Sequence, residues 1–342
     1  MCYYLIYIER RHYNTSKKDH LLYQVLKIVV GALLKIFCRH IKINKPHILK
    51  IRGPVLLASN HPNSLLDAIL IDVLFDQPVY SLARGDVFKN RMVNRILSSL
   101  KMLPVYRVSE GVENLSTNYE TFKACKSIFK KNGIVQIFSE GLCINEWRLR
   151  PLKKGTARLA LSSWEAGIPL QVIPVGINYS SFKRFGKNVF INFGNPITSD
   201  LIDQNLPAGL KHQAFNHLLN SELRKLVYTI PKNDLAMQER LLKIPPSLFK
   251  KIILFIPSLI GFLAHSILFI PVKILALKKA GHNDHYDSFI MVMLLFLYPV
   301  YLLLIFLGMY TSGFIFTGIF MILLLPFTAW AHVQLKPQLD KQ

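Results

Sequence analysis

Residues 55–70 of the 342-residue chain read VLLASNHPNSLLDAIL, and this stretch decides what kind of fold to expect. Its first five residues are mostly apolar and predict a buried strand, whereas the residues after Pro62 carry the apolar period of a helix. His61 lies at the junction, and Asp67 follows six positions later. A histidine and an aspartate placed in this way are either a catalytic pair or ordinary turn and helix-start residues, and the stretch alone leaves both interpretations open.

Short apolar segments continue to alternate with amphipathic segments to about residue 194. Strands are predicted at 55–59, 79–83, 102–106, 134–138, 170–177 and 188–194, and helices at 63–75, 87–100, 113–133 and 154–167. This alternation predicts an α/β fold with a mostly parallel central sheet flanked by helices on both faces. Sites in such sheets lie at the carboxyl ends of strands, and His61, Arg107 and Glu140 all fall at such ends.

The last part of the chain is apolar enough to be a membrane region. No charged residue occurs between positions 288 and 331, and 252–272 is a further run of 21 residues without Asp, Glu, Lys or Arg. Runs of this length cross a membrane as helices at about 1.5 Å per residue. We therefore expect C-terminal hydrophobic membrane helices, with two spans within 289–331 and one further element at 252–272.

The placement of lysines predicts the orientation of these helices. Lysines flank 252–272 on both sides, whereas the turn at 309–313 between the two later spans has none. The positive-inside rule then places the lysine-bearing loops and the C-terminus in the cytoplasm. Because both flanks of 252–272 carry lysines, this segment is expected to enter and leave on one face, as a re-entrant or in-plane element.

Residues 21–37 have a helical period with a thin polar stripe formed by Gln24, Lys27, Gly31 and Lys35. The pattern fits a helix lying in a membrane interface and equally a core helix of the α/β domain, so both interpretations remain open. The expected organisation is an N-terminal amphipathic membrane-associated segment (1–45), an α/β domain (46–232), a linker (233–246) and a C-terminal membrane region (247–342).

The chain is strongly basic, with 42 Lys and Arg against 20 Asp and Glu, a net charge of +22 at pH 7. Such a charge attracts polyanions. Basic residues beside membrane-length apolar runs favour anionic lipid, and the chain lacks a zinc-finger or RNA-recognition signature, so we expect no nucleic-acid partner. The four cysteines are scattered without metal or disulfide spacing and are expected to be reduced thiols of a cytoplasmic compartment.

Four short motifs, in this order along residues 55–179, resemble those of the glycerolipid acyltransferase family. They are NHPNSLLD (60–67), LPVYR (103–107), FSEG (138–141) with the LRPLKKGTA that follows (149–157), and VIPVGINY (172–179). The resemblance implies a fold like that of glycerol-3-phosphate acyltransferases. It also implies an enzyme of phospholipid synthesis that moves an acyl group from a thioester to a hydroxyl of glycerol 3-phosphate or lysophosphatidate. The acyl donor would be acyl-CoA or acyl carrier protein, with no metal and no further cofactor.

By this resemblance His61 is the general base and Asp67 is its partner. A histidine takes the proton of the attacking alcohol, and a carboxylate on its other ring nitrogen fixes the tautomer. The usual first motif has four residues between the two, whereas this chain has five, a spacing similar to that of a branch resembling fungal glycerol-3-phosphate acyltransferases. The third motif also departs from the usual pattern, with Ser139 in place of proline and the nearest arginines at Arg148 and Arg150.

The resemblance further implies an acceptor site. Arg107, Lys153 and Lys154 are available to clamp the phosphate of the acceptor, and Glu140 and Gly141 would shape the site. The helix N-terminus after the first motif is expected to offer backbone N–H groups to the oxyanion that forms on the thioester carbonyl.

Two further features are not expected to carry the chemistry. Cys143 follows the third motif, but isolated cysteines are mostly packing residues. The sequence HNDHYD at 282–287 has two histidines and two aspartates, yet a polar loop between two membrane segments is normally solvated, so no metal site is predicted.

The expected location is a membrane, the bacterial plasma membrane, with the α/β domain on the cytoplasmic face. Membrane lipids, a thioester carrier and a phosphorylated glycerol acceptor are the expected partners. Two alternatives stay open: an acyltransferase for another lysolipid, such as a lyso-aminolipid or lysophospholipid, and a non-catalytic membrane scaffold with the same fold.

Overall fold

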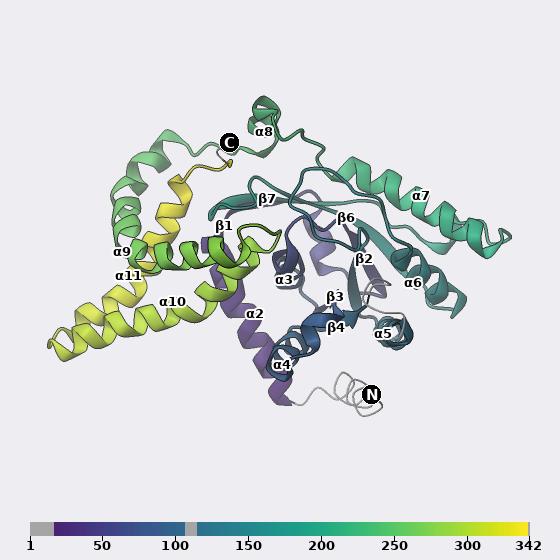
Figure 1. The fold of residues 1–342 in the computed structure, drawn as a ribbon, viewed down its shortest axis with the longest axis horizontal. Helices are drawn as coiled ribbons and strands as arrows, with labels where there is room; N and C mark the ends of the chain where they lie inside the picture. The colour runs from purple at the N-terminus through teal and green to yellow at the C-terminus, as the bar shows by residue number, and fades with distance from the viewer. Residues whose placement is uncertain (1–16, 107–114, 341–342) are drawn as a thin grey trace.

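The computed structural model describes residues 17–106 and 115–340 and contains an α/β domain with long helices at one side (Figure 1). Seven strands form one sheet in the order β1 (Cys38–Ile43), β7 (Lys187–Phe193), β6 (Gln171–Tyr179), β2 (Val55–Ser59), β5 (Ile134–Phe138), β3 (Val79–Arg84) and β4 (Met102–Val105). All neighbouring strands are parallel except β6 and β7. The predicted fold class, a mostly parallel sheet with helices and C-terminal apolar helices, is confirmed.

Helices cover both faces of the sheet. The domain helices are α2 (Lys17–Phe37), α3 (Ser64–Leu74), α4 (Arg91–Ser99), α5 (Leu115–Lys130), α6 (Lys154–Glu165), α7 (Ala208–Leu226) and α8 (Leu235–Leu242), and the C-terminal ones are α9 (Leu248–Ala280), α10 (Tyr286–Thr311) and α11 (Ile315–Leu335). One buried apolar cluster joins the sheet to α2, α3, α4, α9 and α10. A second cluster joins the opposite face to α5, α6 and α7.

Strand β2 shows how the sequence produces this layering. Its five residues are all buried. Val55 and Leu57 belong to the first cluster, whereas Leu56 and Ala58 belong to the second. Successive side chains of a strand point to opposite faces, so a strand covered on both faces reads as a continuous apolar run. The residue that follows β2 therefore leaves the sheet at its carboxyl edge, between the two helical layers.

All six predicted strands are present, and the structure adds β1, which the sequence reading missed. Its sequence, CRHIKI, contains three basic side chains, Arg39, His40 and Lys42, and lacks a clear apolar period. The strand is nevertheless paired in parallel with β7 at the sheet edge. Its buried Arg39 donates hydrogen bonds to the carbonyl oxygens of Val333 and Lys336. The charge of Arg39 made a strand unexpected from the local sequence, and carbonyl groups distant in sequence satisfy it.

Helix α2 combines features of both interpretations of residues 21–37. Part of the polar stripe faces the domain, since the Lys27 ammonium donates to the Phe75 carbonyl oxygen at 2.6 Å. Leu34 and Phe37 are buried in the first cluster. The exposed side chains include Leu21 and Ile28, at 62% and 73% exposure. The helix therefore packs on the domain and still presents an apolar face to its surroundings. The predicted domain boundaries at 46, 233 and 247 stay predictions.

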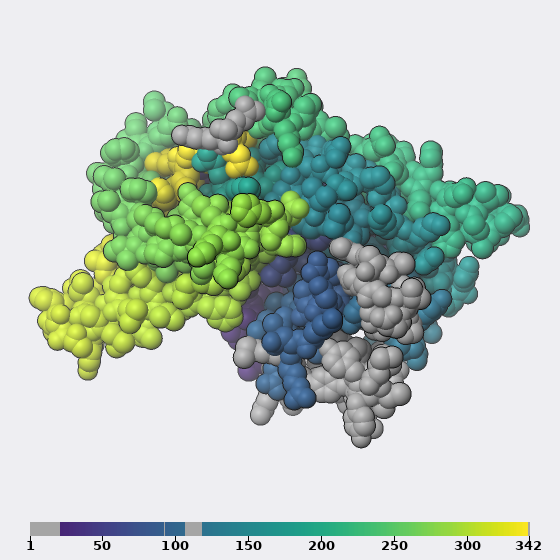
Figure 2. Space-filling model, in the orientation of Figure 1, coloured from purple at the N-terminus to yellow at the C-terminus, as the bar shows by residue number. Residues whose placement is uncertain are grey.

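Three helices, α9, α10 and α11, are long and apolar enough to cross a membrane, and they lie together against one side of the α/β domain (Figure 2). Helix α9 packs closely on α11, since a Cβ added at Gly261 would lie 2.1 Å from the Thr328 carbonyl oxygen. Figure 1 shows α9 bent, and the helix contains Pro257 and Pro271, residues that bend helices.

Both ends of α9 lie near the α/β domain. Near its start, the Lys250 ammonium donates to Gln334 in the last turn of α11, whose neighbour Val333 accepts from Arg39 of β1. The carbonyl of Gly281, which follows α9, accepts from Lys183. This path supports the predicted re-entrant or in-plane arrangement of residues 252–272, which remains a prediction until the sides of the membrane are measured.

Candidate active site

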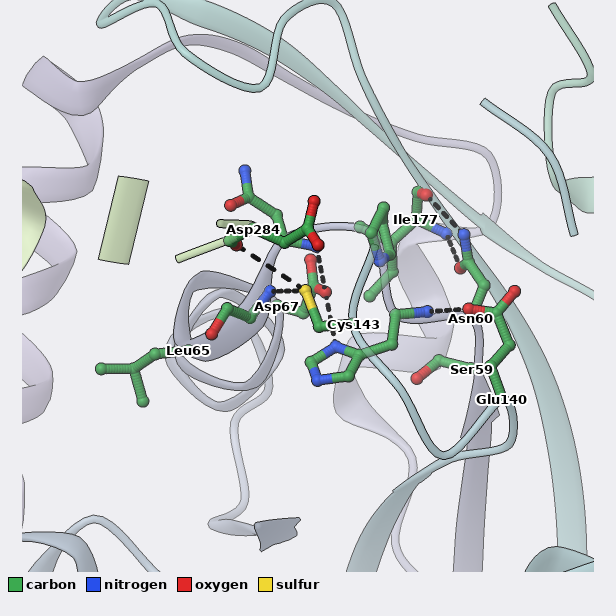
Figure 3. A network of polar contacts seen from close by, with 12 residues as sticks. Ser59, Asn60, Leu65, Asp67, Glu140, Cys143, Ile177 and Asp284 are labelled. Carbon is green, nitrogen blue, oxygen red and sulfur yellow. Dashed lines mark hydrogen bonds and ion pairs between the residues drawn. The ribbon is translucent and has the colours of Figure 1, made fainter. Parts of the chain in front are cut away.

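The predicted catalytic histidine is held at the carboxyl end of β2 by hydrogen bonds on either side of it. The Asn60 side chain exchanges two hydrogen bonds with the backbone of Ile177 in β6, at 2.8 and 2.9 Å. The next backbone N–H, that of His61, donates to the Glu140 carboxylate at 3.0 Å. Figure 3 shows Asn60 beside Ile177 and Glu140 next to this turn. The imidazole of His61 stacks on the Phe138 ring, with centroids 3.8 Å apart, so its position is defined from several sides.

His61 and Asp67 form the pair that the sequence predicted. His61 Nδ1 lies 2.9 Å from Asp67 Oδ2, and the side chains are 17% and 0% exposed. The same carboxylate accepts the Asn63 N–H at 2.7 Å and the Tyr179 hydroxyl at 2.7 Å. A carboxylate with three partners has one defined orientation, so it keeps Nδ1 occupied and leaves Nε2 of His61 as the free ring nitrogen.

The additional residue in the first motif is accommodated where α3 begins. Ser64 is the first residue of the helix and has φ of 47°. This left-handed conformation is uncommon for a residue other than glycine, and it turns the chain sharply between His61 and the helix. Asp67 consequently lies in the first turn of α3 and faces back to the histidine despite the five-residue spacing.

Glu140 positions backbone groups in the described structure. Its carboxylate is buried and accepts two backbone N–H groups, those of His61 and Arg150. Burial raises the pKa of Glu140, and the two N–H donors oppose that rise. Glu140 thereby joins the third motif to the turn that carries His61, and its expected role in shaping the acceptor site stays a prediction.

A cavity of about 2050 Å³ opens beside His61. Gly141, Lys153 and Lys154 all line it, as the prediction of an acceptor site requires. Gly141 has φ of 65°, and a Cβ at this position would lie 3.0 Å from the Lys153 side chain, so glycine leaves room for the lysine. Arg107, the remaining predicted phosphate ligand, lies outside the described residues.

The predicted oxyanion site at the N-terminus of α3 is wrong in this structure. The first backbone N–H groups there already donate to protein acceptors: that of Asn63 to Asp67, that of Ser64 to the Cys143 sulfur at 2.9 Å, and that of Leu65 to the Ser288 hydroxyl at 3.1 Å. Buried N–H groups need partners, and side chains distant in sequence provide them here.

Sequence reasoning missed the loop between α9 and α10 as part of the site. The backbone N–H of Asn145 donates to the Asp284 carboxylate at 2.8 Å, and the hydroxyl of Ser64 lies 2.6 Å from His285 Nδ1. The Asn63 amide donates to Asp287 at 2.7 Å. Polar residues at 282–287 were the available signal, although they suggested a metal or a solvated loop. Within 17–106 and 115–340, no group of three or more possible metal ligands occurs.

Asp287 also forms a buried ion pair with Lys187 at the start of β7. The pair connects α10, the sheet and the Asn63 side chain in one network. The first residues of a membrane-length helix therefore contact the turn that carries His61 and Asn63.

Cys143 is a packing residue in this arrangement. Its side chain is 8% exposed, its sulfur accepts the Ser64 N–H, and burial, aided by the charge of Asp67, raises its pKa above the usual range. A thiol that stays protonated at neutral pH is a poor nucleophile. This environment supports the prediction that Cys143 does not attack the substrate.

Part of the chain is similar to a known family. Residues 40–178, less than half of the chain, match the model of the family described as "Acyltransferase". The matched range contains the His61–Asp67 pair and Glu140. It ends in β6, one residue before Tyr179.

Two individual proteins are similar to this chain. "Glycerol-3-phosphate O-acyltransferase 2" of Saccharomyces cerevisiae is 24% identical over 141 residues, which cover 41% of this chain and 18% of the yeast protein. The chain therefore matches about a fifth of that relative's length. The crystal structure of the 1-acyl-sn-glycerophosphate (LPA) acyltransferase PlsC from Thermotoga maritima is similar over 65% of this chain and 86% of its own, with 16% identity and a TM-score of 0.44.

Proposed function

We propose that this protein transfers a fatty acyl group from a thioester to a hydroxyl of glycerol 3-phosphate or lysophosphatidate, with His61 as general base. The observation that carries the proposal is the His61–Asp67–Tyr179 chain of contacts beside the cavity. The donor is acyl-CoA or acyl carrier protein, since both present a thioester on a phosphate-bearing arm.

The chemistry follows from the free ring nitrogen. The acceptor oxygen attacks the thioester carbonyl carbon while His61 Nε2 takes its proton. The Asp67 carboxylate stabilises the imidazolium that results. When the tetrahedral intermediate collapses, the C–S bond breaks and the imidazolium returns the proton to the leaving thiolate. Asp67 itself keeps its hydrogen bonds throughout, and no covalent enzyme intermediate is needed.

The lining of the cavity supports a substrate with an anionic part. Of the described residues that line it, eight are Lys or Arg and one, Glu165, is acidic. Six of the eight come from α5, from α6 or from Lys153 directly before α6. Phosphate groups bind such clusters through charge-assisted hydrogen bonds. This side of the cavity is therefore where we place the phosphates of the donor arm and of the acceptor.

The other side of the cavity supports an acyl chain. There the lining comes from α3, α4, β4 and α10, and its apolar members are Leu65, Ala68, Val93, Leu97, Met102, Val105, Phe289 and Val292. Covering apolar surface of this kind with an acyl chain contributes about 25 cal/mol per Å² to the free energy of binding. His61 follows β2, whose two faces are covered by α3, α4 and α10 on one side and by α5 and α6 on the other, so we place the thioester of a molecule spanning both sides next to it.

The test is acyl transfer by the detergent-purified protein, comparing the wild type with His61→Ala and His217→Ala. His217 is an exposed histidine of α7 and is not among the residues that line the cavity, which makes it a matched control. Labelled acyl-CoA and acyl carrier protein are each offered with glycerol 3-phosphate, lysophosphatidate and a lysophospholipid that lacks a phosphate monoester.

The expected result is transfer to a phosphate monoester that falls by about 10²-fold or more in His61→Ala and is unchanged in His217→Ala. Transfer only to the other lysolipid would replace the proposed acceptor with the lysolipid alternative. Equal activity in wild type and His61→Ala would contradict the role of His61, and absence of transfer with every acceptor would favour the scaffold.

A further inference from the structure

A second histidine lies in the same cavity as His61 and comes from the loop that precedes α10. His285 Nδ1 is 2.6 Å from the Ser64 hydroxyl oxygen, and both residues line the cavity. Burial lowers the pKa of His285, and the charges of Arg84 and His61 lower it further against the opposing effect of Asp284. At neutral pH the imidazole is therefore uncharged and carries one N–H.

Acyl transfer also needs a hydrogen-bond donor for the oxyanion, in addition to the general base. Attack on the thioester places negative charge on its carbonyl oxygen, and enzymes stabilise that charge with donors fixed in advance. The N-terminus of α3 cannot provide them, because the N–H groups of Asn63, Ser64 and Leu65 already donate to other protein atoms. The donor has to come from side chains or from other segments at the cavity.

The Ser64–His285 pair has one donor to spare in either tautomer. If His285 carries its proton on Nε2, the Ser64 hydroxyl donates to Nδ1 and the Nε2–H remains free. If the proton is on Nδ1, it is donated to the Ser64 oxygen, and the hydroxyl hydrogen remains free. One hydroxyl and one neutral imidazole that share a single hydrogen bond always retain one O–H or N–H for a further acceptor.

The pair is also held in place from both sides. The Leu65 N–H, next to Ser64, donates to Ser288, and the Asp284 carboxylate, next to His285, accepts from the Asn145 backbone. Fixed donors stabilise charge without a reorganisation cost at the moment of reaction, and these flanking bonds provide that rigidity.

We propose that the Ser64–His285 pair donates the hydrogen bond that stabilises the oxyanion of the tetrahedral intermediate. This rests on the proposed acyl transfer. As the acceptor oxygen bonds to the carbonyl carbon, its proton goes to His61 and the negative charge forms on the former carbonyl oxygen, which accepts the hydrogen bond. When the C–S bond breaks, the carbonyl reforms and the pair is released unchanged. The loop between two membrane-length helices thus contributes directly to catalysis.

The experiment measures kcat and KM for His285→Ala, Ser64→Gly and the double variant. Glycine is chosen at position 64 because it removes the hydroxyl and accepts the φ of 47° there, so a loss does not come from strain in the turn. His282→Ala is the matched control, since His282 lies exposed on the same loop and does not line the cavity. His285→Gln restores an N–H donor on a neutral side chain.

The expected loss of kcat is about 10²-fold for each single variant, the lower end for a missing oxyanion donor, with little change in KM. In each case the remaining residue keeps its hydrogen but loses the partner that fixes the direction of that hydrogen. Because the two residues supply one donor, the kcat of the double variant should be at most a few-fold below that of the slower single variant. His285→Gln should recover part of the loss, and His282→Ala should match the wild type.

Three results would overturn the proposal while leaving acyl transfer intact: single variants within about threefold of wild-type kcat, losses that multiply in the double variant, or a rise in KM at unchanged kcat. The last would show that the pair binds the ground state only. A wild-type protein without transferase activity, by contrast, would contradict the proposed function itself and the inference with it.

Discussion

Replacing Asp67 with asparagine separates the charge of this residue from its role in orientation. The backbone N–H of Asn63 donates to the carboxylate oxygen that faces His61, at 2.7 Å. In Asp67→Asn this N–H still needs an acceptor, so the amide oxygen must take the place of Oδ2. The amide NH₂ then takes the place of Oδ1. There it meets the hydroxyl of Tyr179, which can accept as well as donate. The amide oxygen therefore still faces His61 Nδ1 and still selects the same tautomer.

What Asp67→Asn loses is the negative charge beside the imidazolium. A hydrogen bond to a charged partner is stronger than a neutral one by about 1 to 2 kcal/mol, which corresponds to about 5- to 30-fold in rate at 1.36 kcal/mol per tenfold. We expect kcat to fall by this factor with an unchanged unfolding midpoint. Asp67→Ala should instead lower the midpoint, because it leaves the buried Asn63 N–H and Tyr179 hydroxyl unpaired at about 1–3 kcal/mol each.

The assay is acyl transfer at saturating donor, with tryptophan fluorescence on heating as the measure of folding. His61→Ala serves as the reference for complete loss of the base. If Asp67→Asn keeps its midpoint but loses more than about 10³-fold in kcat, the tautomer is not held by Asn63 and the reasoning fails. A loss below twofold would show that the carboxylate charge is not used.

Three further predictions follow from the same structure. Asp287→Ala should lower the free energy of unfolding by about 3–5 kcal/mol, measured by denaturant titration in detergent, because it removes one partner of the buried pair with Lys187 and the acceptor of the Asn63 amide; an unchanged transition midpoint would contradict that pairing. Cys143→Ser should keep kcat within a few-fold of the wild type, and a loss as large as that of His61→Ala would make the thiol a participant. Cysteines introduced as Lys251→Cys and Lys278→Cys should both react with an impermeant maleimide from the same side of a sealed vesicle, and labelling from opposite sides would rule out the re-entrant path of α9.

Local sequence patterns predicted much of the fold because they depend on neighbouring residues. The alternation of apolar segments and amphipathic helices predicted six of the seven strands of the sheet. Strand β1 was missed because it contains the charged, buried Arg39, which is satisfied by the carbonyl oxygens of Val333 and Lys336, far away in sequence. The same limitation applied to α2, whose Lys27 binds the Phe75 carbonyl oxygen on the domain.

The motif residues by themselves determined which side chains to examine. His61 and Asp67 are six positions apart, and the resemblance carried by the four motifs implied that they pair; the structure places Nδ1 and Oδ2 2.9 Å apart. Their order along the chain with Glu140 also pointed to one chemistry. For Glu140 the tertiary structure adds two backbone N–H donors, that of His61 and that of Arg150, ten residues later.

Only the tertiary structure decided how the site is completed. Asp287 bonds to Asn63 across 224 positions, and His285 reaches Ser64 across 221. No local pattern specifies such pairs, because their free energy arises from burial and geometry once the chain has folded. The same distant contacts occupy the N–H groups at the start of α3. The sequence thus determined most of the sheet and the predicted His61–Asp67 pair, whereas packing determined that the end of α9, the following loop and the start of α10 form one wall of the cavity.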